Sequence, residues 1–186
     1  MTTENRTAVR LFVASHDGHS LRVAERLEQR LAGAGLAVTC RRLEGAPPPA
    51  EAVRGASLVV VVAAVRYGRH LPEAEAFLRA YKELPEAPPL AFASVNLTAR
   101  KPEKQTAATN PYVKKLLKRL DLQPVAAAAV AGKLDYPRYR WRDRQIIRFI
   151  MLITGGPTAP STVVEYTDWD RVDAFGDELA SLAPAP

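Results

Sequence analysis

Residues 57–65 read Ser-Leu-Val-Val-Val-Val-Ala-Ala-Val, an almost uninterrupted apolar run. A run this short and this rich in β-branched residues is typical of a strand that is covered on both faces. Strands of that kind lie near the centre of parallel sheets, whose two faces are packed with helices. The run therefore predicts an α/β fold.

Strand-like and helix-like segments alternate on both sides of this run. Such alternation implies right-handed crossovers and predicts a doubly wound sheet of five parallel strands. A stiff connector at Pro47–Pro49 and a short helical piece precede the run, and Thr167 with Asp170 three residues on forms a capping pattern for the last helix. The other strands are expected at 8–14, 37–43, 90–95 and 125–131, and the other helices at 20–32, 72–82, 111–121 and 167 to about 182.

Length and composition restrict the class of protein further. The 186 residues suit one domain, placed here at 1–186. The single cysteine, Cys40, excludes an internal disulfide and a cysteine-rich zinc site, so we expect a cytoplasmic protein without a metal. Met1–Thr7 is polar and indicates no secretory signal. The apolar run Ile146–Ile153 is interrupted by Arg148 and is too short to span a bilayer. If the protein contacts a membrane, we therefore expect it to do so from one side.

The net charge of +6 is unevenly distributed along the chain. Seven basic residues and one acid lie between Arg100 and Arg119, and six basic residues and two acids lie between Ala131 and Arg148. The remainder is mildly acidic. Two basic segments in an acidic domain are typical of a protein that meets nucleic acid, anionic lipid or an anionic small molecule, although a solvated surface shows the same pattern.

The loop after the first strand, Ser15–Ser20, has the composition of a phosphate site. In a doubly wound sheet, ligands bind at the carboxyl ends of the strands. The two serine hydroxyls, the backbone N–H groups and the dipole of the following helix would hold a phosphate, and Gly18 would let the backbone approach closely. A capping serine and an Asp-Gly turn explain the same residues structurally.

Two further strand ends carry candidate ligand-binding groups. Tyr67 and Gly68 follow the central strand, and the tyrosine ring would lie against a planar ligand or be half-buried in a loop. Asn96 follows the strand at 90–95, where its amide and the local backbone suit the edge of a heterocycle, or where it caps a turn. We expect the three loops to meet at one edge of the sheet.

Five motifs of the chain occur in a recognisable order. They are Asp17-Gly18, Val65-Arg66-Tyr67-Gly68, Ser94-Val95-Asn96-Leu97 with Ala99–Lys104, Tyr136–Trp141 and Tyr166-Thr167-Asp168-Trp169. Together they resemble the flavodoxin-like, quinone-dependent protoporphyrinogen IX dehydrogenases of bacterial haem biosynthesis. Ordinary flavodoxins share the fold and the first loop, whereas Arg100–Lys104 and Tyr136–Trp141 are similar to the dehydrogenases specifically. The resemblance runs from about Val9 to Leu182 and implies the strand order 2-1-3-4-5 with a basic insertion at 132–161.

The resemblance implies a non-covalent FMN and the oxidation of protoporphyrinogen IX by a membrane quinone. It places the FMN phosphate in the first loop and the ring system between the other two. No catalytic residue is assigned, and His70 is a lone candidate that we expect to be structural or solvent-exposed. The implied cofactor residues are Ser15, His16, Asp17, Gly18, His19, Ser20, Val65, Arg66, Tyr67, Gly68, Ser94, Val95, Asn96 and Leu97.

The basic segments then acquire expected roles. Guanidinium and ammonium groups suit the two propionates of the substrate, and Arg100, Lys101, Lys104, Arg138 and Arg140 are the expected ligands. If 139–153 is helical, apolar residues share one face and arginines gather on another, which is typical of a helix lying on an anionic membrane surface. Packing against the core or self-association is the alternative. The docking residues are Trp141, Arg144, Ile146, Arg148, Phe149, Ile150 and Ile153.

Two other functions use the same features. A flavodoxin-type electron carrier would bind FMN without oxidising a porphyrinogen, but such carriers are usually acidic. A nucleic-acid-binding module would use the basic segments yet would not need three ligand loops, so we expect no nucleic-acid partner.

Overall fold

The computed structural model describes residues 8–45 and 49–183, so Met1–Thr7 and most of the Pro47–Pro49 connector lie outside the described residues. Its main sheet is parallel, with the strand order β2-β1-β3-β5-β6, and a short strand, β4, pairs antiparallel with β3. This is the predicted order 2-1-3-4-5, counted over the five long strands. Their bounds are β1 Ala8–Ala14, β2 Ala37–Arg42, β3 Leu58–Arg66, β5 Leu90–Asn96 and β6 Ala126–Ala131, with β4 at Arg69–His70.

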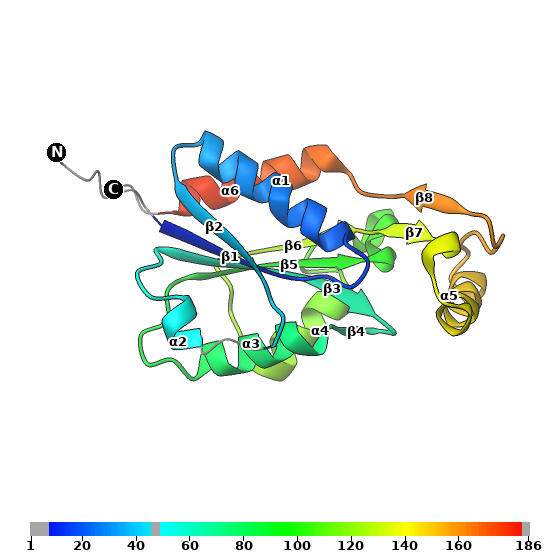
Figure 1. Ribbon diagram of the computed structural model, residues 1–186, viewed down its shortest axis with the longest axis horizontal. Coiled ribbons are helices and arrows are strands. Elements are labelled where there is room, and N and C mark those ends of the chain that lie inside the picture. Colours follow the sequence, from blue (N-terminus) through cyan, green and yellow to red (C-terminus); the bar gives the residue numbers. More distant parts are fainter. Residues whose placement is uncertain (1–7, 46–48, 184–186) are drawn as a thin grey trace.

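Helices cover both faces of this sheet (Figure 1). Helices α1 and α6 pack on one face, and α2, α3 and α4 on the other. Pro72 and Pro111 each occupy the first turn of their helix, where the missing N–H costs nothing. The bounds are α1 His19–Gly33, α2 Pro49–Ala52, α3 Pro72–Lys82, α4 Pro111–Leu120 and α6 Trp169–Leu182.

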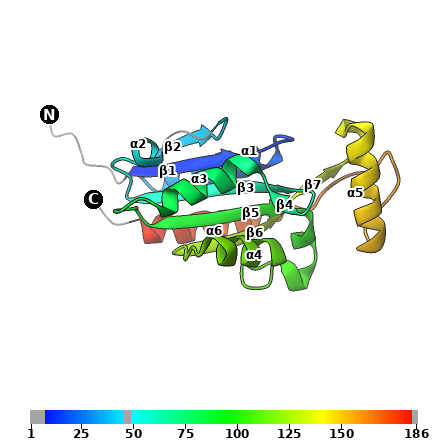
Figure 2. The ribbon, with the colours of Figure 1, turned by 90° about the horizontal axis from the view of Figure 1, so that it is seen from below.

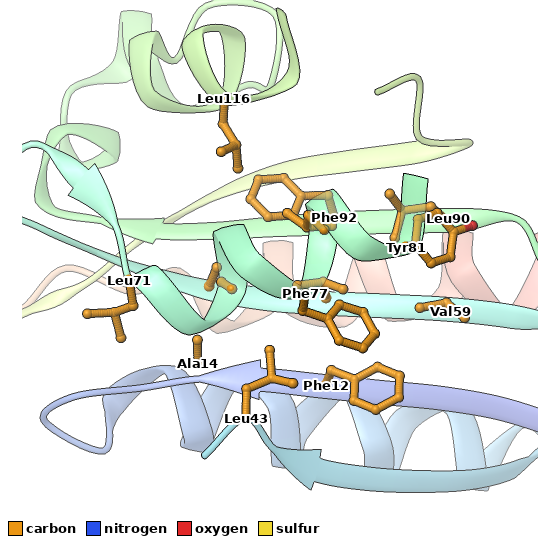
Figure 3. Packing of buried hydrophobic residues seen from close by; sticks show 14 of the residues in the cluster. Phe12, Ala14, Leu43, Val59, Leu71, Phe77, Tyr81, Leu90, Phe92 and Leu116 are labelled. Carbon is orange, nitrogen blue, oxygen red and sulfur yellow. The ribbon is translucent and has the colours of Figure 1, made fainter. Parts of the chain in front are cut away.

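The central strand β3 separates two apolar clusters. Alternate side chains point to opposite faces of a strand, so Val59 and Val61 belong to the cluster under α3 and α4, while Val60 and Val62 belong to the cluster under α1 and α6. On the α3 side, Phe12 and Phe77 stack with ring centroids 4.5 Å apart (Figure 3). Burial on both faces explains why this strand carries almost no polar residue.

A separate unit lies beyond the carboxyl ends of the sheet strands. Strands β7 (Lys133–Asp135) and β8 (Val163–Glu165) form an antiparallel pair, and the chain between them contains helix α5 (Trp141–Ile153). Figure 2 shows α5 standing across the end of the sheet. The predicted helix within 139–153 is confirmed.

The expected strands and helices are confirmed to within a few residues, with one wrong cap. Asp168, not Thr167, caps α6, because its carboxylate accepts a hydrogen bond from the Arg171 N–H. The Thr167 hydroxyl instead donates to the Ala131 carbonyl. Strands β4, β7 and β8 were not predicted, since two or three residues are too few to show a period.

Candidate functional site

A cleft opens at the carboxyl ends of the sheet strands, where all three predicted loops meet. Its walls are the loop after β1, the β3–β4 turn, the segment after β5, the start of β7 and the inner side of α5. The lining residues are Ser15, His16, Asp17, His19, Ser20, Ala64, Val65, Arg66, Tyr67, Gly68, Val95, Asn96, Leu97, Thr98, Arg100, Tyr112, Gly132, Lys133, Tyr139, Ile147, Ile150, Met151 and Thr154.

Three residues that line this cleft carry buried polar atoms without a hydrogen-bond partner. Within 8–45 and 49–183, the buried side-chain nitrogen and oxygen atoms without a hydrogen-bond partner are Ser15 Oγ, His19 Nδ1 and Arg66 Nη1. All three residues line the cleft. A buried polar atom left unpaired costs about 1–3 kcal/mol, so three at one place indicate a site built for a polar ligand.

The loop after β1 has the local structure of an anion site. Gly18 adopts a left-handed conformation (φ +86°) at the start of α1, and no side chain caps the helix there. The first N–H groups of the helix therefore face the loop without an internal partner. Arg42 anchors the loop by donating to the Ser15 carbonyl at 3.0 Å.

An imidazole and a guanidinium face the carboxylate in this loop. Asp17 Oδ1 lies 2.8 Å from His16 Nδ1 and 3.9 Å from Arg66 Nη1. Because the Arg66 guanidinium is positively charged, it offsets part of the repulsion between this carboxylate and a bound anion. The loop residues therefore fit a phosphate group.

The β3–β4 connection is a two-residue hairpin turn. Tyr67 (φ +49°) and Gly68 (φ +77°) are both left-handed, as a type I′ turn requires. A tyrosine in this region is uncommon, and such residues gather at functional sites. The turn leaves the tyrosine ring half-exposed at the cleft, with the Arg66 guanidinium 5.1 Å from the ring centroid.

Helix α5 is tied to this turn through Asp143. The carboxylate accepts hydrogen bonds from the Tyr67 hydroxyl and from Arg66. The hydrogen bond from Tyr67, together with the positive charge of Arg66, holds the pKa of Asp143 below its ordinary value. The link fixes the inner side of α5 against the cleft.

The polar side chains at the end of β5 form hydrogen bonds within the protein. Asn96 Oδ1 accepts from the Ala99 N–H at 3.0 Å and from Asn110 Nδ2 at 3.1 Å, and Asn96 Nδ2 donates to Ser94 Oγ at 3.1 Å. Asn96 therefore caps the short 3-10 helix Leu97–Arg100. The fully buried Ser94 does not line the cleft, so this wall offers a ligand backbone groups and the side chains of Val95 and Leu97.

His70 belongs to the same buried network rather than to the cleft. Its Nε2 lies 2.8 Å from Ser94 Oγ, and its ring meets Phe92 edge-on. Burial, with a smaller contribution from Arg119, lowers the pKa of His70 to about 4. The geometry gives this histidine a structural role, which is one of the two roles expected from the sequence, and excludes the solvent-exposed one.

His70 makes folding sensitive to acid. Its pKa lies below the ordinary value of 6.5, so between pH 6.5 and 4 the unfolded chain binds a proton that the folded chain does not. Stability from this source is present above pH 6.5 and is lost as the pH falls. The free energy of unfolding, measured with urea, falls between pH 7 and pH 5. We expect this fall to be about 2 kcal/mol smaller for His70→Gln than for the unsubstituted protein. Equal losses in both proteins would show that the histidine titrates normally.

The five residues expected to hold propionates are not gathered on one wall. Arg100 lines the cleft, but its guanidinium also donates to the Leu97 carbonyl at 2.8 Å and to the Thr154 carbonyl at 3.1 Å, which ties the end of α5 to the segment after β5. Lys101, Lys104, Arg138 and Arg140 do not line it.

Several lining residues were missed by sequence reasoning. Gly132 and Lys133 directly follow β6, so the rule that ligands bind at the carboxyl ends of strands could have identified them. Tyr112, Tyr139 and the inner residues of α5 carried no comparable signal, because their positions depend on how distant segments cross.

Helix α5 has a protein-facing side and an exposed apolar side. Met151 is buried against Leu134 and Tyr136. Of the expected docking residues, Trp141, Ile146, Phe149, Ile150 and Ile153 are exposed, Ile150 also lines the cleft, and Arg144 and Arg148 are half-buried. Leu152 is exposed as well.

The described helices include none with the length and apolarity needed to cross a bilayer. In the same part of the chain, no three His, Cys, Asp or Glu side chains are grouped to hold a metal ion.

Solved structures with this architecture include flavodoxins. A flavodoxin from Streptococcus pneumoniae TIGR4 superposes with a TM-score of 0.55 at 12% identity, over 94% of this chain and 98% of the other. Oxidised flavodoxin 1 from Bacillus cereus gives 0.55 at 11% identity, over 94% and 97%. A family model described as a flavodoxin domain matches residues 11–161. The fold and the cleft thus define a flavodoxin-like protein, and they point to a flavin cofactor.

Relatives with similar sequences indicate which kind of flavodoxin-like protein this is. The chain is 36% identical over 176 residues to protoporphyrinogen IX dehydrogenase [quinone] of Escherichia coli strain K12, covering 95% of this chain and 96% of the relative. It is 34% identical over 172 residues to the protein of the same name from Leishmania major, covering 92% and 74%. The chain belongs to the flavodoxin-domain family of protoporphyrinogen IX dehydrogenases.

Proposed function

We propose that this protein oxidises protoporphyrinogen IX to protoporphyrin IX with FMN as cofactor and a membrane quinone as electron acceptor. The observation that carries the proposal is that three residues lining one cleft, at the carboxyl ends of the sheet strands, have buried polar atoms without a hydrogen-bond partner. The similarity to relatives that bear this name, 36% identity over 95% of this chain, supports the choice of substrate and acceptor.

The residues of the cleft fit FMN. The N–H groups at the start of α1, with the Ser15 and Ser20 hydroxyls, would hold the phosphate. Tyr67 and the backbone around Leu97 would flank the ring system. When bound, FMN supplies two-electron redox chemistry, and the protein contributes placement and charge.

The overall reaction balances in three equal stages. Each stage removes two electrons and two protons from the macrocycle, and one quinone becomes a quinol, so three quinones are consumed for each protoporphyrin formed. The inner side of α5 places Ile147, Ile150 and Met151 along the cleft, where they would exclude water from an apolar macrocycle.

Anaerobic turnover tests this function directly. Purified protein reconstituted with FMN is mixed with protoporphyrinogen IX and a short-chain quinone, and formation of the fluorescent product is followed. Turnover that requires all three components is the expected result. A yellow protein that leaves the porphyrinogen unchanged would make it a flavodoxin-type electron carrier instead.

Arg138 and Arg140 are proposed to attract the substrate propionates. Both are exposed, and they flank Tyr139, which lines the cleft. Exposed charges act mainly through long-range attraction that salt screens. We expect Arg138→Gln with Arg140→Gln to raise KM for the porphyrinogen about fivefold at low ionic strength, with flavin affinity unchanged. The difference should shrink in high salt, and a KM equal to that of the unsubstituted enzyme at low salt would rule the two arginines out.

We also propose that α5 rests on an anionic membrane surface. Its outer side exposes Phe149, Leu152 and Ile153, and Arg142 is exposed on the same helix. An apolar face with nearby arginines matches the chemistry of a lipid interface. Docking there would bring the cleft, whose wall is the inner side of the same helix, close to a quinone dissolved in the bilayer.

A further inference from the structure

His19 is a cleft residue to which the proposed function gives no specific part. It is the first residue of α1, inside the loop that fits a phosphate, and it lines the cleft. Its ring is half-buried, and the edge-on ring of Trp169 lies 6.1 Å away. Its two ring nitrogens have different surroundings.

The hydrogen bonds around Thr167 determine which ring nitrogen of His19 carries the hydrogen. The Thr167 hydroxyl donates its hydrogen to the Ala131 carbonyl at 2.7 Å, because a carbonyl only accepts. The same oxygen lies 2.6 Å from His19 Nε2, so the imidazole must be the donor there. The neutral ring therefore carries its hydrogen on Nε2 and a bare lone pair on Nδ1. This Nδ1 is buried and has no partner among the described residues.

Burial is the main influence on the pKa of this ring, and it favours the neutral form. Burial lowers the pKa of His19, and Arg22 on α1 and Lys133 on β7 lower it further. Glu165 on β8 opposes them, but its carboxylate already accepts hydrogen bonds from Arg22 and from Trp169 Nε1, each at 2.8 Å. Both oxygens of the Glu165 carboxylate are therefore hydrogen-bonded to groups other than His19.

We propose that His19 takes up a proton at Nδ1 when a flavin carrying a phosphate binds, and that the resulting N–H donates to the phosphate. An anion at the start of α1 would be the negatively charged partner that a protonated imidazole needs. The Nδ1–H would then have a hydrogen-bond acceptor, whereas Nδ1 has no partner in the described structure. The proton comes from solvent and stays on the ring while the ligand is bound. His19 thereby selects FMN over riboflavin, which has no phosphate. This inference rests on the proposed use of FMN.

Calorimetric titration of the flavin-free protein with FMN tests the inference. Titrations near pH 7.5 in two buffers of different ionisation enthalpy give the number of protons taken up per FMN bound. We expect uptake approaching one proton, an FMN affinity that falls with rising pH by up to about tenfold per unit, and a riboflavin affinity that does not change with pH. Measuring uptake on the unsubstituted protein avoids dependence on the folding of a variant.

Two variants locate the proton. His19→Gln keeps a donor for Thr167 but cannot become charged, so it should bind FMN without proton uptake and with a smaller preference over riboflavin. His16→Gln is the matched change at the other histidine of the loop, which faces Asp17, and it should still take up the proton.

The outcomes separate this inference from the proposed function. FMN binding without proton uptake, or uptake that survives in His19→Gln, overturns the role of His19 and leaves the function standing. Failure to bind FMN under any condition overturns both.

Discussion

Replacing Phe149, Leu152 and Ile153 together with glutamine is expected to weaken binding to anionic vesicles at least about a hundredfold. These side chains are 63%, 67% and 68% exposed on the outer side of α5. Burying an aliphatic or aromatic side chain in an apolar phase yields about 1.5–3 kcal/mol when it starts fully exposed. Three such losses, reduced for the partial exposure, come to about 3–5 kcal/mol, which corresponds to two or more powers of ten in affinity.

The same experiment has matched controls on the other end of the molecule. Val125 and Leu182 are also exposed apolar residues, at the amino end of β6 and the last turn of α6. Changing each of them to glutamine should leave sedimentation with vesicles of mixed phosphatidylglycerol and phosphatidylcholine unchanged. If the triple variant sediments as well as the unsubstituted protein at low salt, α5 does not dock on lipid. A shift of the triple variant alone to a smaller size in solution would reveal self-association instead.

The substitution Phe12→Ala is expected to destabilise the fold by about 3–5 kcal/mol. Phe12 is 1% exposed and packs against Phe77 between β1 and α3 (Figure 3). Removing its ring forfeits apolar burial and leaves a cavity that a sheet covered on both faces cannot close by collapsing. Urea unfolding followed by circular dichroism measures the change.

Phe149→Ala provides the control, because it removes the same ring from the exposed side of α5. The expected loss there is under about 1 kcal/mol. Comparable losses at the two positions would contradict the assignment of Phe12 to the core and Phe149 to the surface.

Patterns within single segments predicted most of the fold. The apolar run at 57–65 indicated a strand buried on both faces, and β3 contributes side chains to both clusters. The prolines at 72 and 111 and the glycines at 33 and 35 marked where helices begin or end. These signals are local, since backbone preferences and the period of apolar residues act over a few residues at a time.

The sequence also predicted which loops form the candidate site. Parallel strands end at one edge of the sheet, so identifying three strands was enough to bring their following loops together. Which side chain in a loop remains available could not be predicted in this way. For Asn96 the sequence left two roles open, contact with a ligand or capping of a turn. The structure confirms the cap, through Ala99, and adds a second partner, Asn110, which precedes α4.

By itself, the sequence determined the alternation of strands and helices, the parallel sheet and the edge at which the three candidate loops meet, because these follow from local periodicity and from the handedness of L-residues. Only the tertiary structure decided that Asp143 reaches Arg66 and Tyr67, that Thr167 orients the ring of His19, and that one side of α5 closes the cleft while the other is bare. Each of these contacts joins residues far apart in the chain, and its geometry depends on the crossing of packed elements, which no single segment encodes.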